Sequence, residues 1–272
     1  MPIVCYDEVM SNNYDKELAF AKQLAQNAKL ISDKYYKQPM EFETKKDTSP
    51  VTIADKQINQ LVIDAVQKEF PADGVLGEEA SWHDDRERLW ICDPIDGTIA
   101  FSMGEACCMF SIALVVDGRP VIAVTRDLAN GELFWATAGG GAYRDGQRIS
   151  VSQRPLHEAW LAMPNRLSLL YEYRTVFEDL DEAAYQSNLI HGGVFKGMLI
   201  AQGFADAVVY IKLVNIWDMV AVKLIVEEAG GKFTDLKGQE HRYDKDLVGG
   251  VIVTNGTIHD DVLRITNAAL KV

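Results

Sequence analysis

The stretch Trp90-Ile91-Cys92-Asp93-Pro94-Ile95-Asp96-Gly97-Thr98 is the part of this sequence that decides the fold. Its apolar beginning is typical of a buried strand, and it ends in two carboxylates around a proline, followed by a glycine and a hydroxyl. Strand ends of this kind carry the chemistry of many α/β proteins. Asp93 and Asp96 would repel each other unless a positive charge lay between them, and a hard divalent cation is the usual solution. The stretch therefore predicts a cation site at the end of a buried strand.

The residues that follow the two acids predict an anion site beside the cation site. Thr98 is expected to begin a helix, whose free N–H groups would bind an anion such as phosphate. Carboxylates for a metal beside amides for phosphate are typical of metal-assisted hydrolysis of a phosphate ester. The nucleophile would then be water, activated by the metal together with a positioned hydroxyl and carboxylate.

The N-terminal half of the chain has the pattern of an α+β fold. An apolar stripe at helical spacing predicts a helix over residues 14–36, and a second helix over 52–70 begins with Thr52 and Asp55 placed as a capping box. Between them, the charged and alternating residues 41–47 are typical of an exposed hairpin arm. Strands are expected over residues 89–92, 111–116, 121–127, 133–136 and 149–151.

Short strands and helices alternate after Pro155, which is typical of an α/β part. Strands are expected over residues 160–162 and 207–213, around 233, and over 248–254. Helices are expected over residues 167–180, 195–203, 217–229 and 258–270. We expect two parts without a flexible linker: residues 1–150, which would supply most metal ligands, and residues 151–272, which would supply Asp218 and substrate contacts.

Composition narrows the class of protein. With a formal net charge of −13, the chain is not expected to bind a nucleic acid. No apolar run is long enough to span a bilayer and no targeting segment is evident, so we expect a cytoplasmic protein without a membrane partner. Cys5, Cys92, Cys107 and Cys108 have no zinc-ligand spacing and are expected to be reduced thiols.

Further acids lie at segment boundaries and could point into the same cleft. They are Asp47, the pair Glu78-Glu79, and Asp218. Taken singly, each has an ordinary alternative, since surface acids are common and Asp218 could merely complement a helix dipole. The unit from Asp93 to Thr98 is more specific, because burying two acids without a partner is costly. His191 could line a substrate pocket, although a loop histidine is the simpler interpretation.

Four motifs, in order, resemble the inositol monophosphatase superfamily of magnesium-dependent, lithium-sensitive phosphatases. The resemblance covers nearly the whole chain. It is carried by Lys45-Lys46-Asp47-Thr48-Ser49-Pro50-Val51-Thr52-Ile53-Ala54-Asp55, Gly77-Glu78-Glu79, Asp93-Pro94-Ile95-Asp96-Gly97-Thr98, and Trp217-Asp218 with Glu228-Ala229-Gly230-Gly231. It implies an α+β / α/β fold, a layered αβαβα sandwich, and a phosphoric monoester hydrolase that forms a homodimer.

The resemblance also implies roles for individual residues. Two or three Mg²⁺ ions per site would be held by Glu78, Asp93, the carbonyl of Ile95, Asp96 and Asp218. The catalytic residues would be Asp47, Thr98 and Glu78, with Asp47 and Thr98 orienting the attacking water. Substrate would be bound by Gly97, Thr98, Lys196 and Asp218, with the amides of Gly97 and Thr98 on the phosphate.

The sequence leaves the phosphate ester open. An inositol-1-monophosphatase-like enzyme is the first hypothesis. The small residue Ala100, two positions after Thr98, resembles the residue at that position in some histidinol-phosphate phosphatases. The strand before Trp217 lacks the acid that both kinds of enzyme tend to have there. The run Asn215-Ile216-Trp217-Asp218, with Lys196 upstream, resembles phosphatases of bisphosphorylated nucleotides such as adenosine 3′,5′-bisphosphate. There, Lys196 and Lys212 could meet a second phosphate, or both could be solvated surface lysines.

Two hypotheses from other classes compete with an enzyme. The first is a regulatory or partner-binding protein on the same scaffold, against which stands the complete set of acids at the metal-ligand positions. The second is a purely structural cation site, which would leave Thr98 and the start of its helix without a use.

Overall fold

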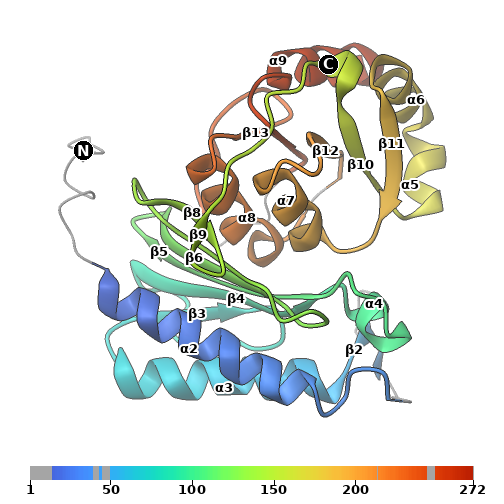
Figure 1. The fold of residues 1–272 in the computed structure, drawn as a ribbon. Helices are drawn as coiled ribbons and strands as arrows, with labels where there is room; N and C mark the ends of the chain where they lie inside the picture. The colour runs from blue at the N-terminus through green and yellow to red at the C-terminus, as the bar shows by residue number, and fades with distance from the viewer. Residues whose placement is uncertain (1–13, 39–42, 45–49, 213, 244–248, 272) are drawn as a thin grey trace.

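The structure is a computed structural model that describes residues 14–38, 43–44, 50–212, 214–243 and 249–271. Helices and sheets alternate in layers (Figure 1). Helices α2 (Asp15–Ser32) and α3 (Ile53–Glu69) cover one face of the first sheet, and α7 (Gly193–Ala201) and α8 (Ile216–Glu228) lie between the two sheets. Helices α5 (Leu167–Glu172), α6 (Arg174–Ala183) and α9 (His259–Leu270) form the outer layer. The expected αβαβα sandwich is confirmed.

The first sheet has seven strands in the order β3-β4-β5-β6-β7-β8-β9. The first two, β3 (Gly74–Gly77) and β4 (Arg88–Asp96), are parallel, and the remaining neighbours are antiparallel. The other strands are β5 (Met109–Val116), β6 (Arg119–Asp127), β7 (Leu133–Thr137), β8 (Gly141–Arg144) and β9 (Gln147–Arg148). A separate short pair joins β1 (Glu43–Thr44) to β2 (Pro50–Val51); β1 lies within the arm expected over residues 41–47, and β2 follows it.

The second sheet has five strands in the order β11-β10-β12-β14-β13. Strand β10 (Trp160–Pro164) pairs in parallel with β11 (Gln186–Ile190) and β12 (Ala207–Tyr210). Antiparallel pairs add β14 (Val251–Thr254) and β13 (Lys232–Asp235). Residues 149–159 connect the two sheets and contain the short 3₁₀ helix η1 (Leu156–Glu158).

Local signals explain several helix boundaries. The Thr52 hydroxyl caps α3 while the Asp55 carboxylate accepts the Thr52 amide, so the expected capping box is present. Helix α4 (Thr98–Met103) begins at the threonine, as expected, after Gly97. Helix α8 is buried almost throughout, because it has a sheet on each side.

Some expectations are wrong in detail. The helix expected over residues 167–180 is two helices, because the backbone at Tyr173 leaves the helical region. Residues 149–151 form no strand, and the sheet ends instead in the hairpin of β8 and β9. Strands β3 and β11 were not expected, because neither shows a clear alternation of apolar and polar residues. Strand β3 is buried on both faces, and β11 is largely exposed.

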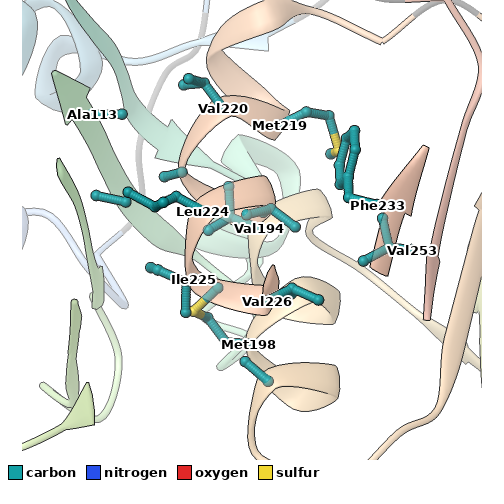
Figure 2. Close-up of a cluster of buried hydrophobic side chains, with 14 of the residues drawn as sticks. Ala113, Val194, Met198, Met219, Val220, Leu224, Ile225, Val226, Phe233 and Val253 are labelled. Carbon is teal, nitrogen blue, oxygen red and sulfur yellow. The ribbon is translucent and has the colours of Figure 1, made fainter. Parts of the chain in front are cut away.

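The largest core lies between the sheets (Figure 2). Leu224 and Ile225 of α8 pack between Ala113 on β5 and the side chains of Phe233 and Val253 from the second sheet. A second core separates α2 and α3 from the first sheet, and a third lies under the outer helices. Within the described residues, no helix is both long enough and apolar enough to cross a membrane.

Candidate metal centre and active site

Strand β4 carries two carboxylates of the site. The strand does not end at residue 92, as the sequence suggested, but continues through Asp96 to the start of α4 (Figure 1). Its pairing with β5 is irregular between Asp93 and Asp96, where Pro94 supplies no N–H to the ladder. Both carboxylates are buried, with Asp93 only 1% exposed. The apolar strand therefore carries two acids into the interior.

The third carboxylate comes from α8, in the other half of the chain. Asp218 lies in the first turn of the helix, where its Oδ2 accepts the Asn215 amide at 3.3 Å. One carboxylate oxygen each from Asp93, Asp96 and Asp218 lies within 4.8 Å of the other two. This group of three oxygens could hold a metal ion.

The electrostatics of the group favour the binding of a positive charge. Burial raises the pKa of Asp93 well above its usual value, and the negative charges of Glu78 and Asp218 raise it further. Burial also raises the pKa of Asp218 to about 8, with the charge of Asp96 as a second cause. Among the described residues, the buried Oδ1 of Asp93 accepts no hydrogen bond. An all-oxygen set of this kind suits a hard cation and not zinc or copper.

Two other expected metal ligands border this group. Glu78 follows β3, and its amide donates to the Cys92 carbonyl at 3.1 Å, which brings the residue beside Asp93. It is not one of the three acids within 4.8 Å of each other. The carbonyl of Ile95 accepts a hydrogen bond from the Thr98 hydroxyl at 3.1 Å.

Asp55 is the residue that the sequence interpretation missed. The Thr98 hydroxyl lies 3.4 Å from Oδ1 of Asp55, whereas Asp47, which was expected beside Thr98, lies outside the described residues. Asp55 is fully buried, and this burial raises the pKa of its carboxyl to about 6. It belongs to the first motif of the resemblance, but its capping role already accounted for the acid at that position.

Gly97 shapes the entrance to α4. Its φ of +81° is left-handed, and a Cβ at this position would lie 2.5 Å from the Cys107 carbonyl oxygen. Glycine is therefore required here on both counts. The resulting turn connects the end of β4 at Asp96 to the start of α4 at Thr98.

The helix α7 holds Asp96 from the other side. The amides of Gly193 and Val194 donate to the two oxygens of Asp96 at 2.9 and 2.8 Å. Lys196, one turn later, is only 5% exposed; its amine donates to the Ile190 carbonyl at 3.2 Å. Burial lowers the pKa of Lys196, while the nearby charge of Asp96 opposes that shift.

The remaining sequence candidates are a surface lysine and three free thiols. Lys212 is half exposed and forms an ion pair with Glu172 at 2.5 Å, which agrees with a solvated surface lysine. Of the described cysteines, Cys92, Cys107 and Cys108 are free, as expected.

Comparison with known proteins places the chain in one family. A profile of the inositol monophosphatase family matches residues 13–270. A histidinol-phosphatase of Chlorobaculum parvum is 32% identical over 89% of this chain and 93% of its own. A fructose-1,6-bisphosphatase/inositol-1-monophosphatase of Thermotoga maritima is 30% identical over 81% of this chain and 84% of its own. The solved structure of an IMPase from Thermotoga maritima superposes with a TM-score of 0.85, at 27% identity, over 94% of this chain and 98% of that one. The chain therefore belongs to the inositol monophosphatase family of metal-dependent phosphomonoesterases.

Proposed function

We propose that the chain is a magnesium-dependent phosphatase that hydrolyses the monoester of a small alcohol by direct attack of water. The observation that carries this proposal is the group of three carboxylates, Asp93, Asp96 and Asp218, beside the start of α4. Such a group is costly without a cation, and its oxygen ligands favour Mg²⁺. The adjacent helix start supplies amides for the phosphate.

Each ligand has a place in this proposal. Glu78, Asp93 and the Ile95 carbonyl would hold one Mg²⁺, and Asp93, Asp96 and Asp218 would hold a second. Glu78 would also contribute to a weaker third ion. When bound, the ions supply positive charge that stabilises the charge developing on the phosphate in the transition state.

Thr98 and Asp55 would orient the attacking water. The Thr98 hydroxyl has two acceptors within reach, Asp55 at 3.4 Å and the Ile95 carbonyl at 3.1 Å, so its lone pairs remain available for a water molecule. With its pKa near 6, the Asp55 carboxylate is ionised at neutral pH and could accept the proton that water loses. We thus propose Asp55 for the role that the resemblance implied for Asp47.

Gly97 and Thr98 would hold the phosphate through their amides. They lie at the N-terminus of α4, where backbone N–H groups lack partners within the helix and would be available to an anion. The hydrolysis then needs no phospho-enzyme, because water is the nucleophile.

The site supports a single phosphate better than a bisphosphorylated nucleotide. Lys196 is buried and bonded to a backbone carbonyl, which is unlike a lysine exposed to a second phosphate. The two sequence relatives have names that indicate different esters, histidinol phosphate in one case and fructose 1,6-bisphosphate or inositol 1-phosphate in the other. Inositol 1-phosphate and histidinol phosphate are therefore the first substrates to examine.

A direct assay tests the proposal. Phosphate release should be measured side by side from inositol 1-phosphate, histidinol phosphate, fructose 1,6-bisphosphate and adenosine 3′,5′-bisphosphate, with Mg²⁺ and with a chelator. We expect Mg²⁺-dependent turnover of at least one of the first two esters. Turnover that persists in the chelator, or none from any ester with Mg²⁺, would overturn the proposal.

We also propose that the chain functions as a homodimer, in which the outer layer of the C-terminal half forms the interface. Leu167 and Tyr171 of α5 and Leu189 of the edge strand β11 are exposed apolar side chains around a groove of about 530 Å³. Light scattering after size exclusion should give twice the mass of one chain, and Leu189→Glu should halve it. A wild-type protein that is monomeric at micromolar concentration would contradict this assembly.

A further inference from the structure

A half-exposed acid and a histidine face each other near the start of α4. Glu105 lies between α4 and β5, His191 lies between β11 and α7, and Nδ1 of His191 is 2.7 Å from Oε2 of Glu105. Nε2 of His191 is 2.7 Å from the amide nitrogen of Asn165. Because that amide donates, Nε2 accepts, and the proton of the imidazole lies on Nδ1, facing Glu105. His191 then donates to the Glu105 carboxylate.

The pair belongs to the wall of the catalytic site. A Cβ at Gly192, the residue after His191, would lie 2.7 Å from the Cys107 carbonyl oxygen and 3.1 Å from Oδ2 of Asp96. The two segments that carry Glu105 and His191 are therefore pressed together beside Asp96. Burial raises the pKa of the Cys107 thiol, and the nearby charge of Glu105 raises it further.

Other acceptors on this wall are already engaged. Both oxygens of Asp96 accept amides of α7, and residues 207–217, which lead along β12 to Asp218, contain no acid. The hydroxyl of Tyr210 donates to the Gly193 carbonyl at 3.2 Å. Among the described residues, His191 is the one hydrogen-bond partner of the Glu105 carboxylate, whose side chain is 38% exposed. The part-exposed carboxylate therefore has a second oxygen that could accept from a ligand.

We propose that Glu105 is a specificity-determining residue that binds a primary ammonium group on the alcohol portion of the phosphate ester, and that His191 is its positioning residue. This inference rests on the function proposed above and deepens it by naming the substrate class. A carboxylate held by a single donor gains more from a charged ammonium than from a hydroxyl, because the hydrogen bonds are charge-assisted. With the phosphate at the start of α4, an amine on the alcohol would extend toward this wall.

A matched pair of esters tests the inference. L-Histidinol phosphate carries the ammonium group, and its N-acetyl derivative lacks that charge but keeps the phosphate and the rest of the alcohol. We expect the wild-type enzyme to prefer the amine, measured as the ratio of kcat/KM values. Glu105→Gln should reduce this ratio on the order of tenfold to a hundredfold, mainly through KM. Glu69→Gln is the matched control, because Glu69 is also paired with a basic side chain but lies at the far end of α3.

Variants of His191 separate positioning from simple folding. His191→Asn keeps an N–H donor near the position of Nδ1 and should retain most of the ratio, whereas His191→Leu removes the donor and should lower it.

Equal losses for both esters, or an unchanged ratio in Glu105→Gln, would overturn the inference while the proposed function stood. Wild-type enzyme that hydrolyses only the N-acetyl ester would do the same. If neither ester were hydrolysed with Mg²⁺ but inositol 1-phosphate were, the inference alone would fail; no hydrolysis of any phosphate ester would remove both.

Discussion

Burial gives the carboxylates of the site their different characters. Asp93 and Asp218 stand among other acids, so burial and mutual repulsion raise their pKa values together. Asp55 is buried as well, but its pKa is held to about 6 because the hydroxyl and amide of Thr52 donate to the carboxylate. The first two suit a cation, and the third suits a base at neutral pH.

Asp93→Asn separates catalysis from folding. We expect turnover with Mg²⁺ to fall at least roughly a thousandfold, because the substitution removes the negative charge of the carboxylate proposed to bind both Mg²⁺ ions. The metal-free variant should unfold at the same temperature as the wild type or higher, since a buried charge becomes a neutral amide. Phosphate release and thermal unfolding in a chelator measure the two effects. Asp260→Asn, on the exposed start of α9, should change neither; retained turnover in Asp93→Asn would refute the assignment.

Asp55→Asn tests the proposed base. The raised pKa means that Asp55 is protonated below about pH 6, so kcat of the wild type should decline with falling pH through that value. The variant should lose roughly a hundredfold to ten-thousandfold in kcat and lose that acid limb as well. Asp64→Asn, exposed on the same helix, is the control. An unchanged pH profile in Asp55→Asn would exclude the role.

At the scale of elements, α8 links the core to the site. Its first turn carries Asp218, and its remaining length is buried between two sheets (Figure 2). A helix in that position is apolar on every side and shows no amphipathic stripe. Because α8 is apolar on every side, the sequence does not show which face meets which sheet. The same apolar surface stabilises the helix in its buried position.

Leu224→Ala measures how much that packing contributes. Leu224 is 5% exposed on α8, and its truncation should lower the free energy of unfolding by about 2–5 kcal/mol. Leu30→Ala removes the same atoms from a side chain that is 55% exposed on α2, and should cost under about 0.5 kcal/mol. Denaturant unfolding gives both values. Equal costs would show that α8 is not packed as described.

At the scale of the whole molecule, the layers bring together acids and amides from distant parts of the chain. Gly193 and Asp96 are 97 residues apart in sequence, yet they are joined by a hydrogen bond of 2.9 Å. Asp218 approaches the same place from a third segment. The site thus exists only when both halves have folded against each other.

The stability of the whole molecule should depend on pH and metal together. Burial raises the pKa of Asp218 from 3.8 to about 8, so its contribution to stability is complete below pH 3.8 and is lost as pH rises through about 8. Asp93 shifts in the same direction. Mg²⁺ would bind the ionised form, so it should raise the melting temperature more at about pH 8 than at about pH 5. Calorimetry at matched ionic strength tests this, and equal gains at the two pH values would contradict it.

Much of the fold could be predicted because its signals are local. The capping box of Thr52 and Asp55 and the helix start at Thr98 each depend on neighbours a few residues away. The strand β11 and the break at Tyr173 depend on contacts with other layers, and the sequence showed neither. Alternation in an exposed edge strand carries little information, because few of its side chains are buried.

The sequence by itself indicated the chemistry. Asp93, Asp96 and Thr98 lie within one short segment, and such a segment is typical of a site for a cation and a phosphate ester whatever the rest of the fold. Only the tertiary structure decided which residues share that site. It placed Asp55 beside Thr98, enclosed Lys196, and set Glu105 against His191. The physical reason is that burial and charge–charge distance belong to the packed layers and not to any one segment, and these two quantities determine the pKa values and the free ligand positions.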